Sequence, residues 1–249
     1  MGLIWRTLHR LEFQTLALLV AAVGAIWTFL GLADEVSEGE TRQIDRTLIL
    51  MLRTAADPAD PLGPRWFEEV MRDITALGGF TFLTLFVIIA VAALAFYRER
   101  RQALVLGVSI ALAAGANDLL KLMFDRARPD LVSHGSYVYT HSFPSGHSML
   151  SAATFLTTAA ILSSFQAQRR AKAFIFTIAV LLTVSVGVSR VYLGVHWPTD
   201  VLGGWTLGAA WALIARIVLS LWREVSPAEA EPLRERESPA VQGPPARGA

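Results

Sequence analysis

Residues 74–96 read ITALGGFTFLTLFVIIAVAALAF, a stretch without one charged side chain. A helix of roughly 20 apolar residues is long enough to cross the hydrocarbon core of a bilayer. The whole chain agrees with this stretch, because 53% of its 249 residues are hydrophobic and only 17% are charged, whereas a soluble domain carries about 25% charged residues. The sequence therefore predicts an integral membrane protein.

Six apolar runs of comparable length are spaced along the chain, and we expect each to be a transmembrane helix. They are residues 12–32, 74–96, 103–124, 147–165, 172–190 and 199–222. The first run follows Arg6 and Arg10 and lacks a small-residue cleavage site, so we expect a retained span and not a cleaved signal peptide. The predicted fold is all-α, a polytopic six-transmembrane-helix bundle over residues 1–223. Residues 224–249 are expected to form a disordered tail.

Basic residues gather at alternate ends of these runs. They occur at the N-terminus, in YRERRQ (97–102), in QAQRRAK (166–172) and at Arg223. With six spans all of these fall on one side, and the positive-inside rule assigns that side to the cytoplasm. Both termini and the tail are then expected in the cytoplasm. The loops that would face outward are residues 33–73, 125–146 and 191–198.

Charged and imidazole groups at membrane depth are costly and usually mark function. Here they are concentrated in KLMFDRARP (121–129), HSFPSGHS (141–148) and SRVYLGVHWPTD (189–200). The first stretch closes the third span, the second opens the fourth, and the third joins the fifth span to the sixth. The count of spans alone therefore places all three polar stretches at the same, outward end of the bundle.

The first and third stretches supply cations. Lys121 and Arg128 are seven residues apart and share a helical face if the helix continues that far, with Pro129 ending it. Two cations on one face favour an anionic ligand, although Asp125 could instead neutralise Lys121. Arg190 adds a planar guanidinium group, whose donors suit phosphate oxygens.

The second and third stretches supply a helix start and two histidines. Ser145 can cap the helix that begins after it, and Gly146 lets a ligand approach the backbone, beside His147. His196 and Asp200 are spaced i, i+4, so the carboxylate can fix the imidazole tautomer and leave the other nitrogen as a nucleophile. These residue types suit phosphoryl transfer through a histidine. No carboxylate cluster accompanies the histidines, so we expect neither a metal nor another cofactor.

Each signal also has a plainer interpretation. PSGH could be only a turn and a cap, the His196–Asp200 pair an interfacial hydrogen bond, and Lys121 a side chain that snorkels to water. Their joint occurrence at one end favours a site. A non-enzymatic anion or phospholipid carrier is the alternative from another class, but a carrier needs polar groups along its depth. The net charge of +1 argues against a nucleic-acid partner.

The three stretches resemble the signature of the type 2 phosphatidic acid phosphatase superfamily, the membrane lipid phosphate phosphatases. That signature has Lys, six residues and Arg-Pro, then Pro-Ser-Gly-His, then Ser-Arg, five residues, His, three residues and Asp. All three parts are present without departure. The resemblance extends from Asp45 to about residue 220. It implies a six-span bundle and metal-independent dephosphorylation through a phosphohistidine.

The resemblance also implies a role for each residue. His196 would be the nucleophile, Asp200 its orienting carboxylate and His147 the general acid. The implied phosphate-binding residues are Lys121, Arg128, Ser145, Gly146 and Arg190. The implied substrate is a lipid phosphate or diphosphate of the undecaprenyl diphosphate, phosphatidylglycerophosphate or phosphatidic acid class, met among membrane lipids at the outer face of the cytoplasmic membrane.

Residues 42–73 of the long outward loop are expected to lie on the membrane as amphipathic helices. In the first helix, an apolar stripe is formed by Ile44, Leu48 and either Met51 or Leu52, with Asp45, Arg46 and Arg53 lying largely away from it. A second apolar stripe leads into the second span and contains either Trp66 or Phe67, followed by Val70, Met71 and Ile74. These helices could guide the lipid chain of a substrate or only brace the bundle, and the sequence leaves both open.

Overall fold

The computed structural model describes residues 2–131 and 141–224. Within these ranges the chain forms α-helices and no β-strand. The helices are α1 (Gly2–Glu38), α2 (Arg42–Leu50), α3 (Arg65–Ala76), α4 (Phe80–Phe96), α5 (Arg100–Phe124), α6 (Gly146–Ser164), α7 (Arg169–Tyr192) and α8 (Pro198–Glu224). The predicted all-α class is confirmed. The expected disordered tail lies, from residue 225 on, outside the described residues.

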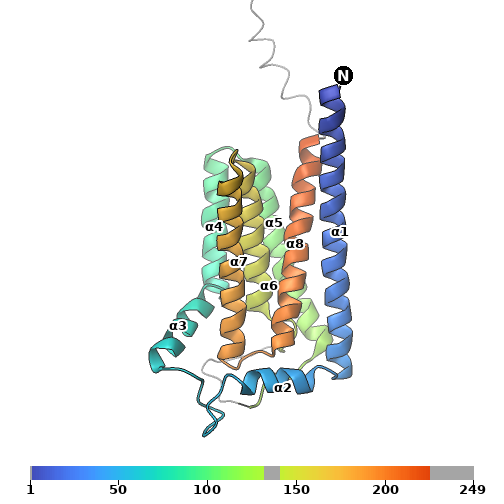
Figure 1. The fold of residues 1–249 in the computed structure, drawn as a ribbon. Helices are drawn as coiled ribbons and strands as arrows, with labels where there is room; N and C mark the ends of the chain where they lie inside the picture. The colour runs from blue at the N-terminus through green and yellow to red at the C-terminus, as the bar shows by residue number, and fades with distance from the viewer. Residues whose placement is uncertain (1, 132–140, 225–249) are drawn as a thin grey trace, which may run out of the picture.

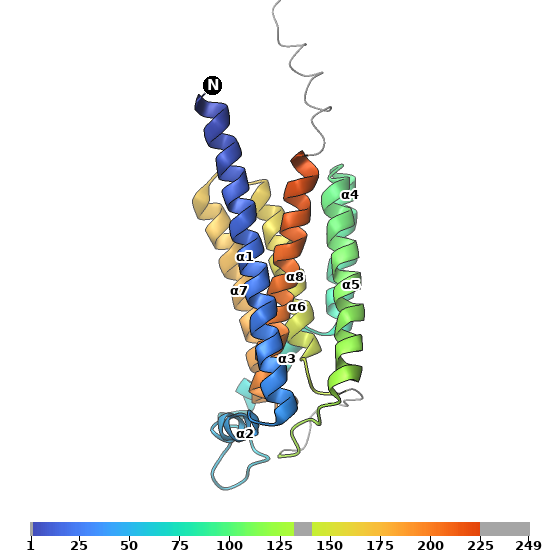
Figure 2. The ribbon, with the colours of Figure 1, turned by 90° about the vertical axis from the view of Figure 1, so that its right-hand side faces the viewer.

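The long helices α1 and α4 to α8 run side by side, whereas the short α2 lies across one end of the bundle and α3 slants away from that end (Figure 1). The N-terminus and the end of α8 lie together at the opposite end, as a view turned by 90° also shows (Figure 2). The α4–α5 and α6–α7 connections share the end with the termini. The connections after α2, α5 and α7 share the other end, which is the alternation expected from the sequence.

Four helices are long and apolar enough to cross a membrane: α5, α7, α8 and the part of α1 from Phe13 on. A fifth is formed if α3 and α4, which are bent by 47°, are one span. The structure and composition thus support a multi-pass membrane protein with four or five such helices, and the count of six stays a prediction. Helix α6 carries seven serines and threonines among its 19 residues, which lowers its hydropathy.

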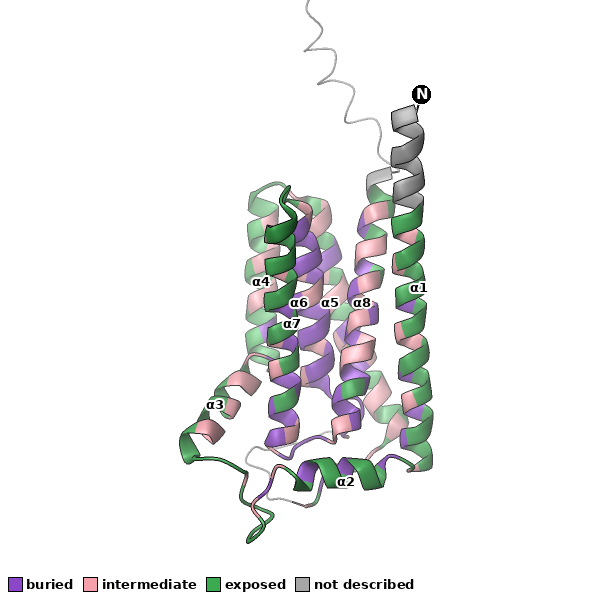
Figure 3. Cartoon of the chain, viewed as in Figure 1, coloured by how far each residue is buried: buried purple, intermediate pink, exposed green. Residues whose placement is uncertain are grey.

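Helix α6 is the centre of the bundle (Figure 3). Thirteen of its nineteen residues are buried, whereas much of α1 and α7 is exposed at the bundle surface. A helix surrounded by other helices contacts little lipid, so hydroxyl side chains within it do not have to face hydrocarbon. This position explains why a central helix has the more polar sequence.

The second span differs from its expected range of 74–96. Helix α3 ends at Ala76 and α4 begins at Phe80, so the helix is interrupted at Leu77–Gly79. The interruption brings Gly78 against the neighbouring helices. A Cβ atom at Gly78 would overlap the side chain of Val186 and lie 3.3 Å from the carbonyl oxygen of His147. Tight packing of the backbone at this point, which apolar periodicity does not reveal, accompanies the break.

The third span ends at residue 124, as expected, and its helix does not continue into the polar residues that follow. Helix α5 stops at Phe124, because Asp125 takes a left-handed conformation with φ of 44°. The condition for a face shared by Lys121 and Arg128, a helix that continues to residue 128, is therefore not met. Pro129 follows a segment that is already irregular and does not end the helix.

Helices α6 and α8 approach each other through glycine. A Cβ atom at Gly208 would lie 2.5 Å from the carbonyl oxygen of Met149, and one at Gly204 would lie 2.7 Å from that of Ser145. Small residues that let two backbones meet are typical of helix contacts in membranes. This close contact places the start of α6 beside the start of α8.

We expect Gly208→Ala to destabilise the bundle, since the added methyl group meets backbone that cannot move away. Overpacking of this kind costs about 1–3 kcal/mol. Gly115→Ala in α5 is the matched control, because nothing lies within 4 Å of its Cβ position. Thermal unfolding of the two purified variants in detergent measures the difference. Equal melting temperatures would contradict the close α6–α8 contact.

Candidate active site

The three polar stretches meet at the end of the bundle where α2 lies. Lys121 is in the last turn of α5, His147 is in the first turn of α6, and Arg190 is in the last turn of α7. A Cβ atom at Gly146 would lie 3.5 Å from Nζ of Lys121. His147 interacts electrostatically with Arg190, His196, Lys121 and Arg128. The structure thus brings the residues named from the sequence into one cluster.

His196 and Asp200 form a buried pair, exposed by 1% and 0%. Nδ1 of His196 lies 3.3 Å from Oδ2 of Asp200, and the hydroxyl of Ser142 donates a hydrogen bond to the same carboxylate oxygen. A proton on Nδ1 would therefore point to the carboxylate and leave the lone pair on Nε2. Nε2 lies 3.1 Å from a guanidinium nitrogen of Arg128, which also donates to the carbonyl oxygen of Val195 at 2.7 Å.

The His196 imidazole is kept neutral. Burial lowers the pKa of His196 well below its ordinary value, and the positive charges of Arg190, Arg128 and Lys121 lower it further. A neutral imidazole has a free lone pair on one ring nitrogen, which a nucleophile requires.

The start of α6 is joined to the start of α8. Ser145 is the N-cap of α6, and its hydroxyl accepts hydrogen bonds from the backbone nitrogen and the hydroxyl of Ser148 at 3.5 and 3.0 Å. The backbone nitrogen of Ser145 donates to the carbonyl oxygen of Asp200 at 3.0 Å. The first backbone N–H groups of a helix have no intrahelical acceptor and attract anions. The N-terminus of α6 therefore lies beside the His196–Asp200 pair.

Arg190 enters the cluster from α7 and is exposed by only 5%. One guanidinium nitrogen donates to the hydroxyl of Thr75 at 3.0 Å, while Nε is buried without a hydrogen-bond partner. Asn117 is also buried, with its Oδ1 unpartnered. Its amide nitrogen would lie 3.2 Å from a Cβ at Gly146. Neither Thr75 nor Asn117 is predicted to be a site residue from the sequence, although a polar residue one helical turn before Lys121 is a usable signal.

Asp125 is paired with His141, and the acidic residues whose charges act on Lys121 are Asp118 and Asp200. Oδ1 of Asp125 lies 2.6 Å from Nδ1 of His141, and both side chains are substantially exposed. Arg128 reaches His196 from the irregular segment after α5, whereas Lys121 belongs to α5 itself. Lys121 and Arg128 therefore come from different structural elements. Within residues 13–131 and 141–222, no three histidine, aspartate or glutamate side chains form a group that could hold a metal ion.

The position of Asp45 differs most from the one that the sequence predicts. Asp45 was expected on the outer face of a membrane-lying helix, but it is fully buried. The backbone nitrogen and hydroxyl of Thr199 donate to its carboxylate at 3.0 and 2.7 Å, and Arg126 lies 2.7 Å away. The buried face of α2 is Thr41, Asp45 and Ile49, spaced four residues apart. This spacing was the signal that could have identified it.

The apolar stripe expected in α2 points away from the bundle. Ile44, Leu48 and Met51 are exposed by 58%, 41% and 65%. In the second stripe Trp66 is exposed by 62%, whereas Phe67 packs edge-on against Tyr192 of α7 with ring centroids 5.2 Å apart. Phe67 therefore braces the bundle, and the exposed apolar groups are available to lipid.

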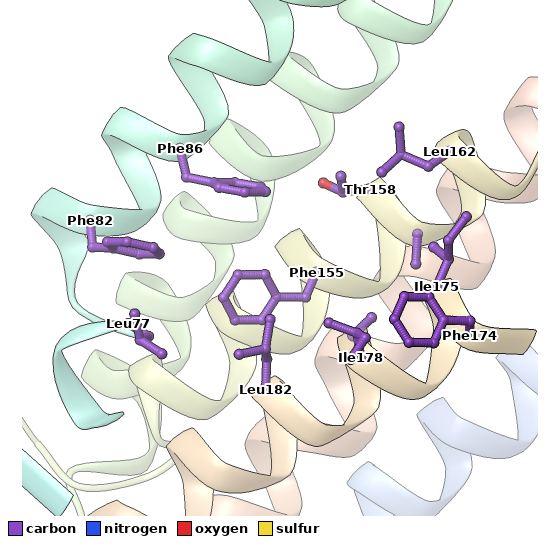
Figure 4. Close-up of a pocket in the computed structure, with 12 residues that line it drawn as sticks. Leu77, Phe82, Phe86, Phe155, Thr158, Leu162, Phe174, Ile175, Ile178 and Leu182 are labelled. Carbon is purple, nitrogen blue, oxygen red and sulfur yellow. The ribbon is translucent and has the colours of Figure 1, made fainter. Parts of the chain in front are cut away.

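An apolar cavity of about 320 Å³ opens between α4, α6 and α7 (Figure 4). Its walls include Phe82 and Phe86 of α4, Phe155 of α6 and Phe174 of α7. Leu77 also lines it, and the next residue, Gly78, packs against His147. The cavity therefore extends along the bundle from a point beside the polar cluster.

Comparison with known proteins gives a consistent result. Residues 102–224, which include all three polar stretches, match the PAP2 superfamily. The chain is 40% identical over 147 residues to phosphatidylglycerophosphatase B of Bacillus subtilis (strain 168), covering 57% of this chain and 70% of that protein. It is 29% identical over 121 residues to an undecaprenyl-diphosphatase of Sulfolobus acidocaldarius, covering 47% of this chain and 54% of that protein.

The fold is similar to a solved structure. A transmembrane PAP2-type phosphatidylglycerolphosphate phosphatase from Bacillus subtilis superposes with a TM-score of 0.71 at 30% sequence identity. The superposition covers 83% of this chain and 98% of that one. The similarity thus extends well beyond the polar cluster to most of the helical bundle.

Proposed function

The chain belongs to the PAP2 superfamily of membrane lipid phosphate hydrolases, and on this premise we propose that it dephosphorylates its lipid through a phosphohistidine on His196. One observation carries the proposal. The buried imidazole has Nδ1 directed at Asp200 and Nε2 directed at the guanidinium of Arg128. A neutral histidine oriented in this way presents a lone pair where an anionic phosphoryl group would be attracted.

The proposed reaction has two steps. Nε2 of His196 attacks phosphorus, the N–P bond forms and the P–O bond to the lipid breaks, while His147 gives a proton to the departing oxygen. Water then attacks the phosphohistidine with His147 as the base, which releases inorganic phosphate and restores His196. Asp200 stabilises the charge that develops on the imidazole.

The cations around His196 would hold the phosphoryl oxygens. Lys121, Arg128 and Arg190 come from three parts of the chain and all interact electrostatically with the buried imidazole. Ser145 and the backbone of Gly146 add the N-terminus of α6. Charge that spreads over the transferring group in the transition state would be matched by these fixed donors.

The proposed substrate is a lipid phosphate or diphosphate. The names of the relatives make phosphatidylglycerophosphate and undecaprenyl diphosphate the first members of a substrate panel, with phosphatidic acid as the third. A hydrocarbon chain suits the apolar cavity between α4, α6 and α7, because that cavity begins beside His147. The carrier alternative is not favoured, since the charged groups are concentrated at one end of the bundle.

We propose further that six helices cross the membrane, that both termini lie in the cytoplasm and that the cluster faces outward. The support is the distribution of basic residues. The α4–α5 connection with Arg98 and Arg100, and the start of α7 with Arg169 and Arg170, lie at the end opposite the cluster. The positive-inside rule assigns that end to the cytoplasm.

We expect the purified protein to release inorganic phosphate from this lipid panel in the presence of EDTA, and His196→Gln to abolish release while leaving the protein folded. His141→Gln is the matched control, because His141 lies on a neighbouring loop, paired with Asp125. Phosphate assays on the three proteins make the comparison. More than a few per cent of activity in His196→Gln would exclude His196 as the nucleophile.

The orientation is measurable with single cysteines, since the chain has none. Cysteine at Ala59, in the exposed loop beside the cluster, should react with an impermeant maleimide in intact cells. Cysteine at Ala167, in the α6–α7 connection, should react only after permeabilisation. The opposite labelling pattern would place the cluster in the cytoplasm.

The cavity is tested by filling it. Ile178 lines the cavity, whereas the equally accessible Val180 does not. We expect Ile178→Trp to lower kcat/KM for a long-chain lipid phosphate by about 10-fold. This is the effect of no longer burying one or two methylene groups of the lipid chain. A short, water-soluble phosphomonoester should be hydrolysed as before, and Val180→Trp should change neither. Equal losses on both substrates in Ile178→Trp would argue against a chain in this cavity.

A further inference from the structure

One guanidinium group lies between two buried carboxylates at the active site. Arg126 is in the irregular segment after α5, and its side chain is exposed by 12%. One terminal nitrogen lies 2.6 Å from Oδ1 of Asp200, and the other lies 2.7 Å from Oδ2 of Asp45. Arg126 stands at one of the six unspecified positions between Lys121 and Arg128, so the signature assigns it no role.

The hydrogen bonds of Asp200 are divided between its two oxygens. Oδ1 accepts from Arg126. Oδ2 accepts from the hydroxyl of Ser142 and from the backbone nitrogen of Trp197, and faces Nδ1 of His196. A carboxylate that turned about its bond would lose these partners together. Arg126 therefore fixes the plane in which the other oxygen meets the histidine.

The same guanidinium also balances charge. Asp45 and Asp200 are both exposed by 0%, and Arg126 is the cation of the ion pairs shown for each of them in the described part of the chain. Without it, both carboxylates would lose the charged group that the structure shows in contact with each of them. Removing one partner of a buried pair leaves an uncompensated charge, which the protein relieves by rearrangement or by binding a proton.

Asp45 contacts the terminal nitrogen of Arg126 that does not contact Asp200. The Asp45 carboxylate accepts from the backbone nitrogen and the hydroxyl of Thr199, in the first turn of α8. The hydroxyl of Thr199 and that of Thr41 also lie within 2.8 and 3.2 Å of the guanidinium nitrogens. The guanidinium is thus held from α2 and from α8, so its position relative to Asp200 is set by two helices.

We propose that Arg126 is a positioning residue for the phosphatase reaction and that Asp45 supports it. Arg126 holds Asp200 so that Oδ2 orients Nδ1 of His196 and Nε2 is presented to phosphorus. The inference rests on the proposed role of His196 as nucleophile. Arg126 acts through Asp200 and does not itself contact the phosphoryl group. The competing account is that Arg126 only attaches α2 to the bundle.

The experiment compares Arg126→Gln, Arg126→Lys and Asp45→Asn with wild type, on protein shown to be folded by gel filtration and thermal unfolding. We expect Arg126→Gln to lower kcat by about 10- to 100-fold, the usual effect of losing an orienting partner, with KM changed by less than about 3-fold. Arg126→Lys should recover part of kcat, because an ammonium group restores the charge but not the two-pronged contact.

Asp45→Asn should lower kcat less than Arg126→Gln, since the contact with Asp200 survives. The double variant should be no slower than Arg126→Gln, because Asp45 acts through Arg126. Arg72→Gln is the matched control, as Arg72 pairs with Glu68 on the exposed surface of α3. It should keep the wild-type kcat.

The outcomes separate the two accounts. A folded Arg126→Gln variant with wild-type kcat and a lowered melting temperature would leave only the attachment of α2 and overturn the inference. If Arg126→Gln does not fold, the same comparison is made with Arg126→Lys and Asp45→Asn: wild-type kcat with a lowered melting temperature in both would overturn the inference. An inactive wild type, or an active His196→Gln, would instead overturn the proposed function. The two failures are therefore distinguishable.

Discussion

The carboxylate of Asp200 is buried at the end of a membrane bundle, and a charge in that position requires several hydrogen-bond donors. Ser142 donates from the segment before α6, Trp197 from the segment before α8, and Arg126 from the segment after α5. The backbone carbonyl of the same residue accepts from Ser145 at the start of α6. One residue thus joins three segments that are far apart in the sequence, and the positions of His196 and of the α6 N-terminus follow from it.

This arrangement needs the two central helices to be unusually close. Gly204 and Gly208 let α8 meet the backbone of α6, and the contact extends from Ser145 to Ala153. A larger residue at either glycine would separate the start of α6 from the start of α8. Small apolar and hydroxyl side chains between these helices therefore position the site, in addition to contributing to the packing of the core.

Local rules are enough to predict much of this molecule. Apolar runs of sufficient length locate the long helices, and counting them places the polar stretches at one end, because each helix reverses the direction of the chain. The sequence did not reveal contacts made across the fold. Asp45 meets Thr199, which is 154 residues away; the spacing of Thr41, Asp45 and Ile49 can indicate a buried face but does not identify this partner. The break before Phe80 likewise accompanies backbone packing against His147, and the low hydropathy of α6 is tolerated because other helices surround it.

The end of α5 at Phe124 also serves the site. In a helix, residues two apart project in very different directions, whereas outside a helix they can point the same way. After the left-handed Asp125, Arg126 contacts Oδ1 of Asp200 and Arg128 contacts Nε2 of His196. The carbonyl oxygen of Ala127 between them accepts a hydrogen bond from the Trp197 indole at 2.9 Å. One short irregular segment therefore holds both ends of the His–Asp pair, and a helix that continued to Pro129 could not do so.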